Sequence, residues 1–236
     1  MRVIVVAGGD APERAALDAA WPGWDIPCDL VVAADRGAVT AIALGLRPDV
    51  VVGDVDSLGP DEAWRIAAAG IPFERVPVEK DETDTELALL VAVRRGATRI
   101  AILGALGGPR IDHSLANVAL LGHPVLEGRP TEILDGRTRI RLLFAGAGGP
   151  ATLALPGRVG DTVSLLPIGD PARGVVTHGL AYPLEGGDLP AGLARGVSNI
   201  RTALEARVGL GAGRLLVVEI ADGTGVPVPS GAGGAP

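Results

Sequence analysis

The sequence predicts an α/β fold in two parts: an N-terminal, mostly parallel sheet with helices on both faces, followed by a C-terminal antiparallel β-sandwich domain. In the first part, continuous apolar runs alternate with stretches whose apolar residues recur at helical spacing, which is typical of βα units around a buried parallel sheet. Beyond Arg137 the helical spacing is lost and turn residues recur roughly every ten residues, which is typical of antiparallel strands.

Short apolar runs predict the strands of the first part, at residues 3–7, 30–33, 50–52, 73–76, 99–103 and 131–134. Between them, apolar residues at helical spacing predict helices that begin near Pro12 and that span residues 39–46, 60–69 and 83–94. Strands that alternate with helices in this way favour parallel pairing, because each crossover then returns the chain to the same edge of the sheet.

In the second part, strands are expected at residues 138–144, 151–155, 161–166, 175–178, 196–201 and 214–220. We therefore expect an α/β domain over residues 1–140 and a β-sandwich domain over residues 141–222. The end of the chain, residues 223–236, is rich in Gly and Pro and is expected to be disordered.

The composition is that of a folded, soluble protein: of 236 residues, 47% are apolar and 21% charged. A net charge of -7 gives no electrostatic footprint for nucleic acid or an anionic membrane. The N-terminal apolar run is too short for a signal sequence or a membrane span, and the single Cys28 forms no intramolecular disulfide. These features together favour a cytoplasmic protein.

Two acidic clusters stand out. Asp54 and Asp56 directly follow an apolar run, where a buried strand is expected to end, and Asp81 and Asp84 precede a helix that Thr83 or Asp84 can cap. If the clusters face each other, like charges about 4 Å apart repel by about 4 kcal/mol at an effective dielectric near 20. Such a group requires a cation, protons or a basic partner, and Mg²⁺ that carries phosphate oxygens fits best.

A third unusual stretch, residues 104–117, follows the strand expected at residues 99–103. Its glycines allow close approach of a ligand, and Arg110 offers a planar fork suited to phosphate. His113 is not expected to bind zinc, because no Cys or His lies at metal-ligand spacing from it.

Asp35 also lies at a strand end, where ligand contact and helix capping remain equally open. For Gly8 and Gly9, a structural role in the turn is favoured over a phosphate cradle.

These motifs, in this order, resemble those of thiamine pyrophosphokinase. The resemblance covers both halves of the chain, with G-D-x-D-S at residues 53–57, K-D-x-T-D at residues 80–84, a glycine–Arg–x–Asp–His element at residues 107–113, and Ser198-Asn199. One departure is Pro109, which interrupts a continuous Gly-Gly-Arg. The resemblance implies transfer of a diphosphoryl group from ATP to thiamine, with release of AMP, dependence on Mg²⁺, and a homodimer.

The resemblance also implies roles for individual residues. Six would be catalytic: Asp54, Asp56, Asp81, Asp84, Arg110 and Asp112, of which the first four would hold Mg²⁺ or orient the hydroxyl. Others would bind ATP or thiamine: Asp35, Ser57, Lys80, Thr83, Gly107, Gly108, His113, Asn117, Ser198 and Asn199. No aromatic residue follows Ser198, so an aromatic that stacks on thiamine has to come from elsewhere in the chain.

Two alternatives remain open. A pyrophosphokinase for another hydroxymethyl heterocycle, such as 6-hydroxymethyl-dihydropterin, would share the phosphate machinery. A non-catalytic regulator that binds thiamine or a nucleotide would keep the folds, although clustered carboxylates without a metal role are costly to retain. A P-loop kinase is excluded, because the only lysine, Lys80, has no G-x-x-x-x-G-K-[ST] context.

Overall fold

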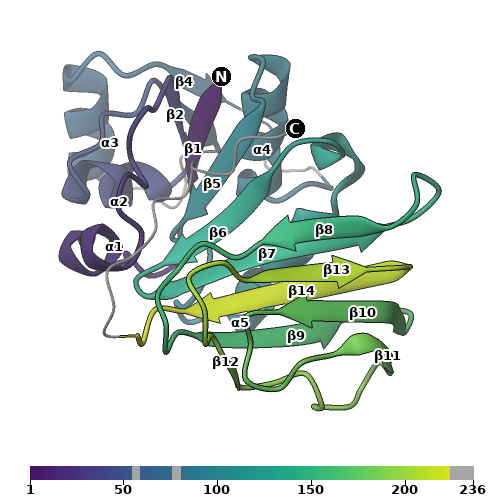
Figure 1. Cartoon of the computed structure of the whole chain (residues 1–236). Helices are drawn as coiled ribbons and strands as arrows, with labels where there is room; N and C mark the ends of the chain where they lie inside the picture. Colours follow the sequence, from purple (N-terminus) through teal and green to yellow (C-terminus); the bar gives the residue numbers. More distant parts are fainter. Residues whose placement is uncertain (55–58, 76–80, 224–236) are drawn as a thin grey trace. The chain divides into compact units, whose positions relative to one another are not determined.

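The computed structural model describes residues 1–54, 59–75 and 81–223 (Figure 1). The chain divides into two compact units: unit 1 is Met1–Ala15 with Asp25–Gly136, and unit 2 is Ala16–Trp24 with the chain from Arg137 onward. The division falls between residues 136 and 137. The tail predicted to be disordered lies, from residue 224 onward, outside the described residues.

Unit 1 is built on a parallel sheet, which confirms the predicted fold class. Its strands are β1 (Arg2–Val6), β2 (Leu30–Ala34), β3 (Val50–Gly53), β4 (Phe73–Arg75), β5 (Arg99–Leu103) and β6 (Thr131–Asp135). They pair in parallel in the order β6-β5-β1-β2-β3-β4. The apolar side chains of β1 from Val3 to Val6 are all buried. Because neighbouring side chains point to opposite faces of a sheet, both faces of β1 must be covered.

Helices supply that cover. The helices up to residue 126 are α1 (Arg14–Ala20), which begins in unit 1 and continues into unit 2, α2 (Gly37–Ala43), α3 (Pro60–Ala68), α4 (Asp84–Arg94), α5 (Ile111–Ala119), and the 3₁₀ turns η1 (Leu120–Gly122) and η2 (Pro124–Leu126). Of these, α4 packs on β1, β2 and β3, and α2 packs on β1 and β2 (Figure 1). Within the part of the chain that the structure describes, no helix is both long and apolar enough to span a bilayer.

The helix predicted for residues 39–46 is displaced toward the N-terminus. It begins at Gly37 and ends at Ala43, and Gly45 adopts a left-handed conformation with φ 74°. The amide of Gly45 donates to the carbonyl of Ile42, and the amide of Leu46 donates to that of Ala41, which is the Schellman pattern of helix termination. The prediction was wrong at this end because the apolar spacing continues past the glycine that stops the helix.

Unit 2 is an antiparallel sandwich, as predicted. One sheet has the order β12-β9-β14-β7 and the other β11-β10-β13-β8. The strands are β7 (Thr138–Ala145), β8 (Ala151–Ala154), β9 (Thr162–Pro167), β10 (Ala172–His178), β11 (Glu185–Leu189), β12 (Asn199–Ile200), β13 (Arg207–Leu210) and β14 (Gly213–Ile220). Buried side chains from both sheets, such as Val163, Val175, Val208 and Val217, form one core.

Two strands of unit 2 were missed from the sequence, and one was predicted too long. The missed strands β11 and β13 have the sequences Glu-Gly-Gly-Asp-Leu and Arg-Val-Gly-Leu, whose glycines carry little strand propensity. They form because β10 pairs with both of them through its backbone. The strand predicted over residues 196–201 contracts to Asn199–Ile200.

A group of charged side chains is buried inside unit 2. Arg139 on β7 faces Glu219 on β14 and donates two hydrogen bonds to its carboxylate, at 2.9 and 2.8 Å. Arg141 donates a further bond at 2.5 Å, and Arg201 lies 3.8 Å away. Burial by itself raises the pKa of Glu219, but Arg139 and Arg141 outweigh it and lower that pKa. Glu219 is therefore ionised at neutral pH and balances the buried guanidinium groups.

The segment Ala16–Trp24 belongs with unit 2 because of this charged group. The guanidinium carbon of Arg139 lies 4.5 Å from the centroid of the Trp21 ring, within cation–π range. The side chain of Arg158 also donates a hydrogen bond to the carbonyl of Ala19. The segment Ala16–Trp24 thus contacts the guanidinium groups of Arg139 and Arg158 in unit 2.

Glu219→Gln is expected to destabilise the fold strongly, because it leaves buried guanidinium groups without their counter-charge. Breaking such a buried pair costs about 3 to 5 kcal/mol. Denaturant unfolding measures the loss. Asp222→Asn is the matched control, since Asp222 pairs with Arg137 at 3.0 Å with side chains 39% and 64% exposed, and exposed pairs contribute about 0 to 1 kcal/mol. Equal losses in both variants would show that Glu219 does not balance buried charge.

Candidate functional site

The carboxyl ends of the parallel strands gather the polar residues of unit 1 at one edge of its sheet. Asp35 follows β2, Asp54 follows β3, and the turn at Gly8 and Gly9 follows β1. The glycine loop, residues 104–108, follows β5. Parallel strands that pair side by side end at a common edge, and open α/β sheets bind their ligands there.

Asp35 is held in an uncommon backbone conformation at this edge. Its φ is 49°, in the left-handed region, and its amide donates to the carbonyl of Val52 at 2.9 Å. A Cβ built on Gly53 would lie 3.2 Å from the Cβ of Asp35, so the Asp35 side chain packs directly against the residue before Asp54. The N-cap residue of α2 is Arg36, which disfavours the capping role left open for Asp35. Such backbone strain clusters at functional sites.

The second acidic cluster surrounds the start of α4. Thr83, and not Asp84, is the N-cap, and its Oγ1 accepts a hydrogen bond from the amide of Glu86 at 3.2 Å. Asp84 is the first residue of the helix and is half-buried, while Asp81 is exposed. The N-terminus of a helix favours negative charge, so it stabilises these carboxylates.

Three residues of the predicted site are not among those that the structure describes. Asp56, Ser57 and Lys80 lie outside the described residues. Among the residues that are described, no three His, Cys, Asp or Glu side chains form a metal-binding group. Mg²⁺ commonly takes only one or two carboxylates and completes its octahedron with water and phosphate oxygens, so the hard oxygen donors of Asp54 and Asp84 fit this ion.

The glycine loop packs closely against the turn after β1. A Cβ on Gly107, which has φ 74°, would lie 2.2 Å from Oδ2 of Asp10. A Cβ on Gly9 would lie 2.4 Å from the carbonyl oxygen of Leu106. Both positions therefore require glycine for the close approach of the two segments. This contact supports the structural role for Gly9, whereas Gly108 is exposed at the edge of the sheet.

Arg110 and Asp112 form an exposed ion pair at the start of α5. Nε of Arg110 donates to Oδ1 of Asp112 at 2.9 Å, and one terminal nitrogen donates to Oδ2. These bonds lower the pKa of Asp112 to about 2. Because the folded pKa is lowered, the pair favours the folded state above pH about 4 and loses this effect as the pH falls through about 2. At neutral pH Asp112 thus holds the guanidinium of Arg110 in place.

The remaining predicted residues of α5 lie in different environments. His113 is exposed beside Arg110 and Asp112. Asn117 is only 6% exposed, and its Nδ2 donates to the carbonyl of Ala105 in the glycine loop at 2.8 Å. Asn117 therefore lies behind the loop, where it contacts backbone.

In unit 2, both polar atoms of the Asn199 side chain form hydrogen bonds with backbone groups. Its Oδ1 accepts from the amides of Tyr182 at 3.0 Å and Ile200 at 2.9 Å, and its Nδ2 donates to the carbonyl of Tyr182 at 2.7 Å. Ser198, with φ 62°, donates its amide to Oγ of Ser164 at 3.0 Å. Tyr182 is 69% exposed. Tyr182 could not be predicted from the sequence, because no local pattern connects it to the Ser-Asn pair.

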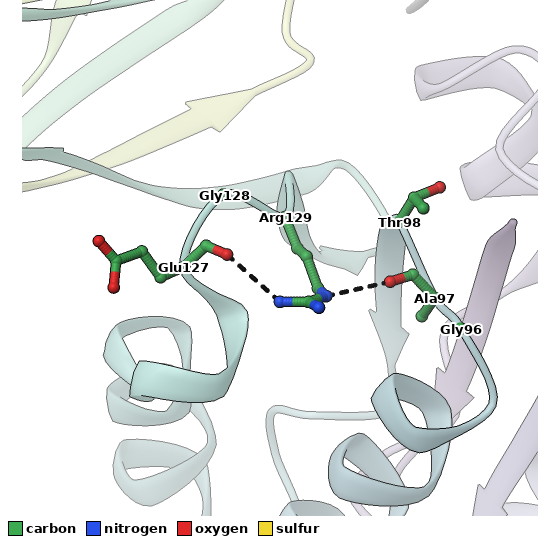
Figure 2. Close-up of a pocket in the computed structure, with 6 residues that line it drawn as sticks. All are labelled: Gly96, Ala97, Thr98, Glu127, Gly128 and Arg129. Atoms are coloured by element: carbon green, nitrogen blue, oxygen red, sulfur yellow. Dashed lines mark hydrogen bonds between the residues drawn. The ribbon is translucent and has the colours of Figure 1, made fainter.

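A pocket of about 410 Å³ lies at the opposite edge of the unit 1 sheet, where β5 and β6 begin (Figure 2). Arg129 lines it and donates to the carbonyls of Ala97, Val125 and Glu127, at 3.1, 2.9 and 3.3 Å. The bonds to Ala97 and Glu127 tie together the residue that follows η2 and the turn before β5 (Figure 2). Arg129 is thus a structural tie far from the carboxylates.

An open parallel sheet with carboxylates and an arginine in the connections that follow its strands is typical of enzymes that bind phosphorylated ligands. Known proteins identify the family. The thiamin pyrophosphokinase catalytic domain matches residues 26–132, and the thiamin pyrophosphokinase vitamin B1 binding domain matches residues 152–214. The chain belongs to the thiamine pyrophosphokinase family, whose enzymes are diphosphotransferases.

Individual relatives agree with this assignment. Thiamine pyrophosphokinase of Bacillus subtilis (strain 168) is 29% identical over 195 residues, which cover 83% of this chain and 87% of the relative. The crystal structure of thiamine pyrophosphokinase from Bacillus subtilis matches with a TM-score of 0.79 and 26% identity, over 94% of this chain and 100% of that one. That of thiamin pyrophosphokinase from Geobacillus thermodenitrificans matches with a TM-score of 0.78 and 26% identity, over 96% of this chain and 100% of that one.

Proposed function

We propose that this protein transfers the terminal diphosphoryl group of ATP to the hydroxyl of thiamine, and that the products are thiamine diphosphate and AMP. The proposal is supported by the positions of Asp35, Asp54, Asp84 and Arg110, each of which stands between a parallel strand of unit 1 and the helix after it or begins that helix, in a chain of this family. The match of residues 152–214 to a vitamin B1 binding domain favours thiamine over a pterin as the acceptor.

The chemistry requires positioning and charge neutralisation, without a covalent enzyme intermediate. The hydroxyl oxygen of thiamine bonds to the β-phosphorus of ATP, the bond from that phosphorus to the α–β bridging oxygen breaks, and AMP leaves. One carboxylate among Asp54, Asp56, Asp81 and Asp84 accepts the hydroxyl proton. Mg²⁺, when bound by these carboxylates, neutralises the polyphosphate. Arg110, oriented by Asp112, contacts the transferred phosphates.

Other residues then serve binding. Asp35, Ser57, Lys80, Thr83, Gly107, Gly108 and His113 line the ATP site of the α/β domain, residues 1–140. Ser198 and Asn199 belong to the thiamine-binding and dimerisation domain, residues 141–222. Exposed apolar side chains of unit 2, such as Leu193, Val197 and Leu204, could be buried in the interface of a homodimer. The protein would act in the cytoplasm. Light scattering that finds an active monomer would contradict the dimer.

Incubation with ATP, Mg²⁺ and thiamine is expected to yield AMP in equal amount to thiamine diphosphate, because the two terminal phosphoryl groups move as a unit. Chromatography of the nucleotides measures this. A parallel reaction with 6-hydroxymethyl-dihydropterin tests the alternative acceptor. Stoichiometric ADP with thiamine monophosphate, or AMP formed only with the pterin, would refute the proposal.

Asp54→Asn and Asp84→Asn are each expected to lower kcat roughly 10² to 10³-fold and to shift the Mg²⁺ dependence to higher concentration. Because both residues serve one site, the double variant loses much less than the product of the single losses. Asp49→Asn is the matched control: Asp49 lies at the other end of β3 and accepts a hydrogen bond from the amide of Val31 at 2.8 Å. Unchanged kinetics in the first two variants would remove those carboxylates from the site.

Tyr182 is proposed as the aromatic partner of the thiamine cation, since Asn199 holds its backbone and its side chain is exposed. Tyr182→Ala is expected to raise the KM for thiamine about twofold to thirtyfold, because a cation–π contact is worth about 0.5 to 2 kcal/mol. The KM for ATP should not change, and Tyr182→Phe, which keeps the ring, should behave as wild type. Steady-state kinetics decide, and an unchanged KM for thiamine in Tyr182→Ala would exclude this contact.

A further inference from the structure

The glycine loop after β5 has a hydrogen-bond donor on each of four consecutive carbonyls. Two donors are backbone amides of the turn after β1: Gly9 to Gly104 at 2.8 Å and Asp10 to Leu106 at 2.9 Å. The other two are side chains of α5: Nδ2 of Asn117 donates to the carbonyl of Ala105 at 2.8 Å, and Oγ of Ser114 donates to that of Gly107 at 3.2 Å. The loop is therefore tied alternately to two different elements.

The side chains and the first loop residues that form these hydrogen bonds are buried. Ser114 and Asn117 are 7% and 6% exposed, and Gly104 and Ala105 are buried. From Gly107 to Arg110, in contrast, every residue is exposed. The loop thus has a buried, fully bonded base and an exposed end that leads directly into Arg110.

We propose that Asn117, assisted by Ser114, is a positioning residue for diphosphoryl transfer. It holds the carbonyl of Ala105 inward, so that the exposed end of the loop and Arg110 keep one geometry toward the polyphosphate of ATP. This inference rests on the proposed function, and it gives Asn117 an indirect role in place of contact with ATP. Groups that align reacting atoms act through small displacements, and a shift of about 1 Å can cost about 10²-fold in rate.

The chemistry of the tie explains why an amide stands at this position. The partner is a carbonyl oxygen, so the side chain must donate a hydrogen bond, and it must do so in a buried place without carrying a charge. The amide of asparagine meets both conditions. A carboxylate of the same shape would instead place a negative oxygen against the carbonyl of Ala105.

Asn117→Asp tests this tie. At pH 8 it is expected to lower kcat/KM for ATP by at least about tenfold. Burial raises the pKa of the introduced carboxyl, and its protonated form can again donate to the carbonyl of Ala105. The ratio of variant to wild-type kcat/KM should therefore rise as the pH falls from about 8 to about 6. Asn117→Ala, which has no donor at any pH, should show a loss that does not depend on pH.

Arg129→Met is the matched control. It removes a side chain that bonds three backbone carbonyls at the opposite edge of the same sheet, so it lowers stability without touching the loop. At a temperature where all variants are folded, its kcat and its KM for ATP should equal those of wild type. Equal kinetic losses in Arg129→Met and Asn117→Ala would overturn the proposal, as would a ratio for Asn117→Asp that stays flat with pH at wild-type level.

Hydrogen exchange provides a readout besides activity, and it keeps the proposal testable if Asn117→Asp does not fold. Peptides that span residues 104–110 should exchange faster in Asn117→Ala and in Ser114→Ala than in Arg129→Met. Unchanged exchange in the first two variants would overturn the tie itself. If wild type forms no AMP while this exchange pattern is found, the proposed function fails and the tie stands.

Discussion

Parallel backbone pairing in unit 1 is the constraint on which the site depends. The ladder does not stop where the strands end: the amide of Ala7 donates to the carbonyl of Leu103 at 2.8 Å, and that of Asp35 to Val52 at 2.9 Å. These bonds carry the pairing past the carboxyl edge and fix the segments that follow each strand. Asp35 has a left-handed backbone conformation, which costs about 1 to 3 kcal/mol. The surrounding hydrogen bonds hold it in this conformation.

The chain contains two asparagines, and both bond backbone in the structure. Asn117 ties the glycine loop of unit 1, and Asn199 holds both backbone groups of Tyr182 in unit 2. In each case a buried amide holds in place a segment whose exposed part is available to a ligand. Both residues are rare in this sequence, and in the structure both side-chain amides bond backbone groups of neighbouring segments.

Burial decides what the ion pairs of this protein contribute. Glu219 is 2% exposed and bonded by two arginines, so removal of its charge leaves uncompensated cations in the core. Arg110 and Asp112 have side chains 65% and 60% exposed, where solvent screens their attraction. The exposed pair therefore adds little to stability, and its value lies in the orientation of Arg110.

The sequence by itself determined the strands and most helices of unit 1, the sandwich of unit 2 and the positions of the acidic motifs, because apolar periodicity and strand ends are local features. Three matters were decided only by tertiary structure. The glycine-poor strands were predicted, but β11 and β13 form through pairing with β10. Ala16–Trp24 joins unit 2 because Trp21 meets Arg139. Asn117 bonds the glycine loop and Asn199 bonds Tyr182. These hydrogen bonds join residues that are distant in the sequence, so no local pattern predicts them.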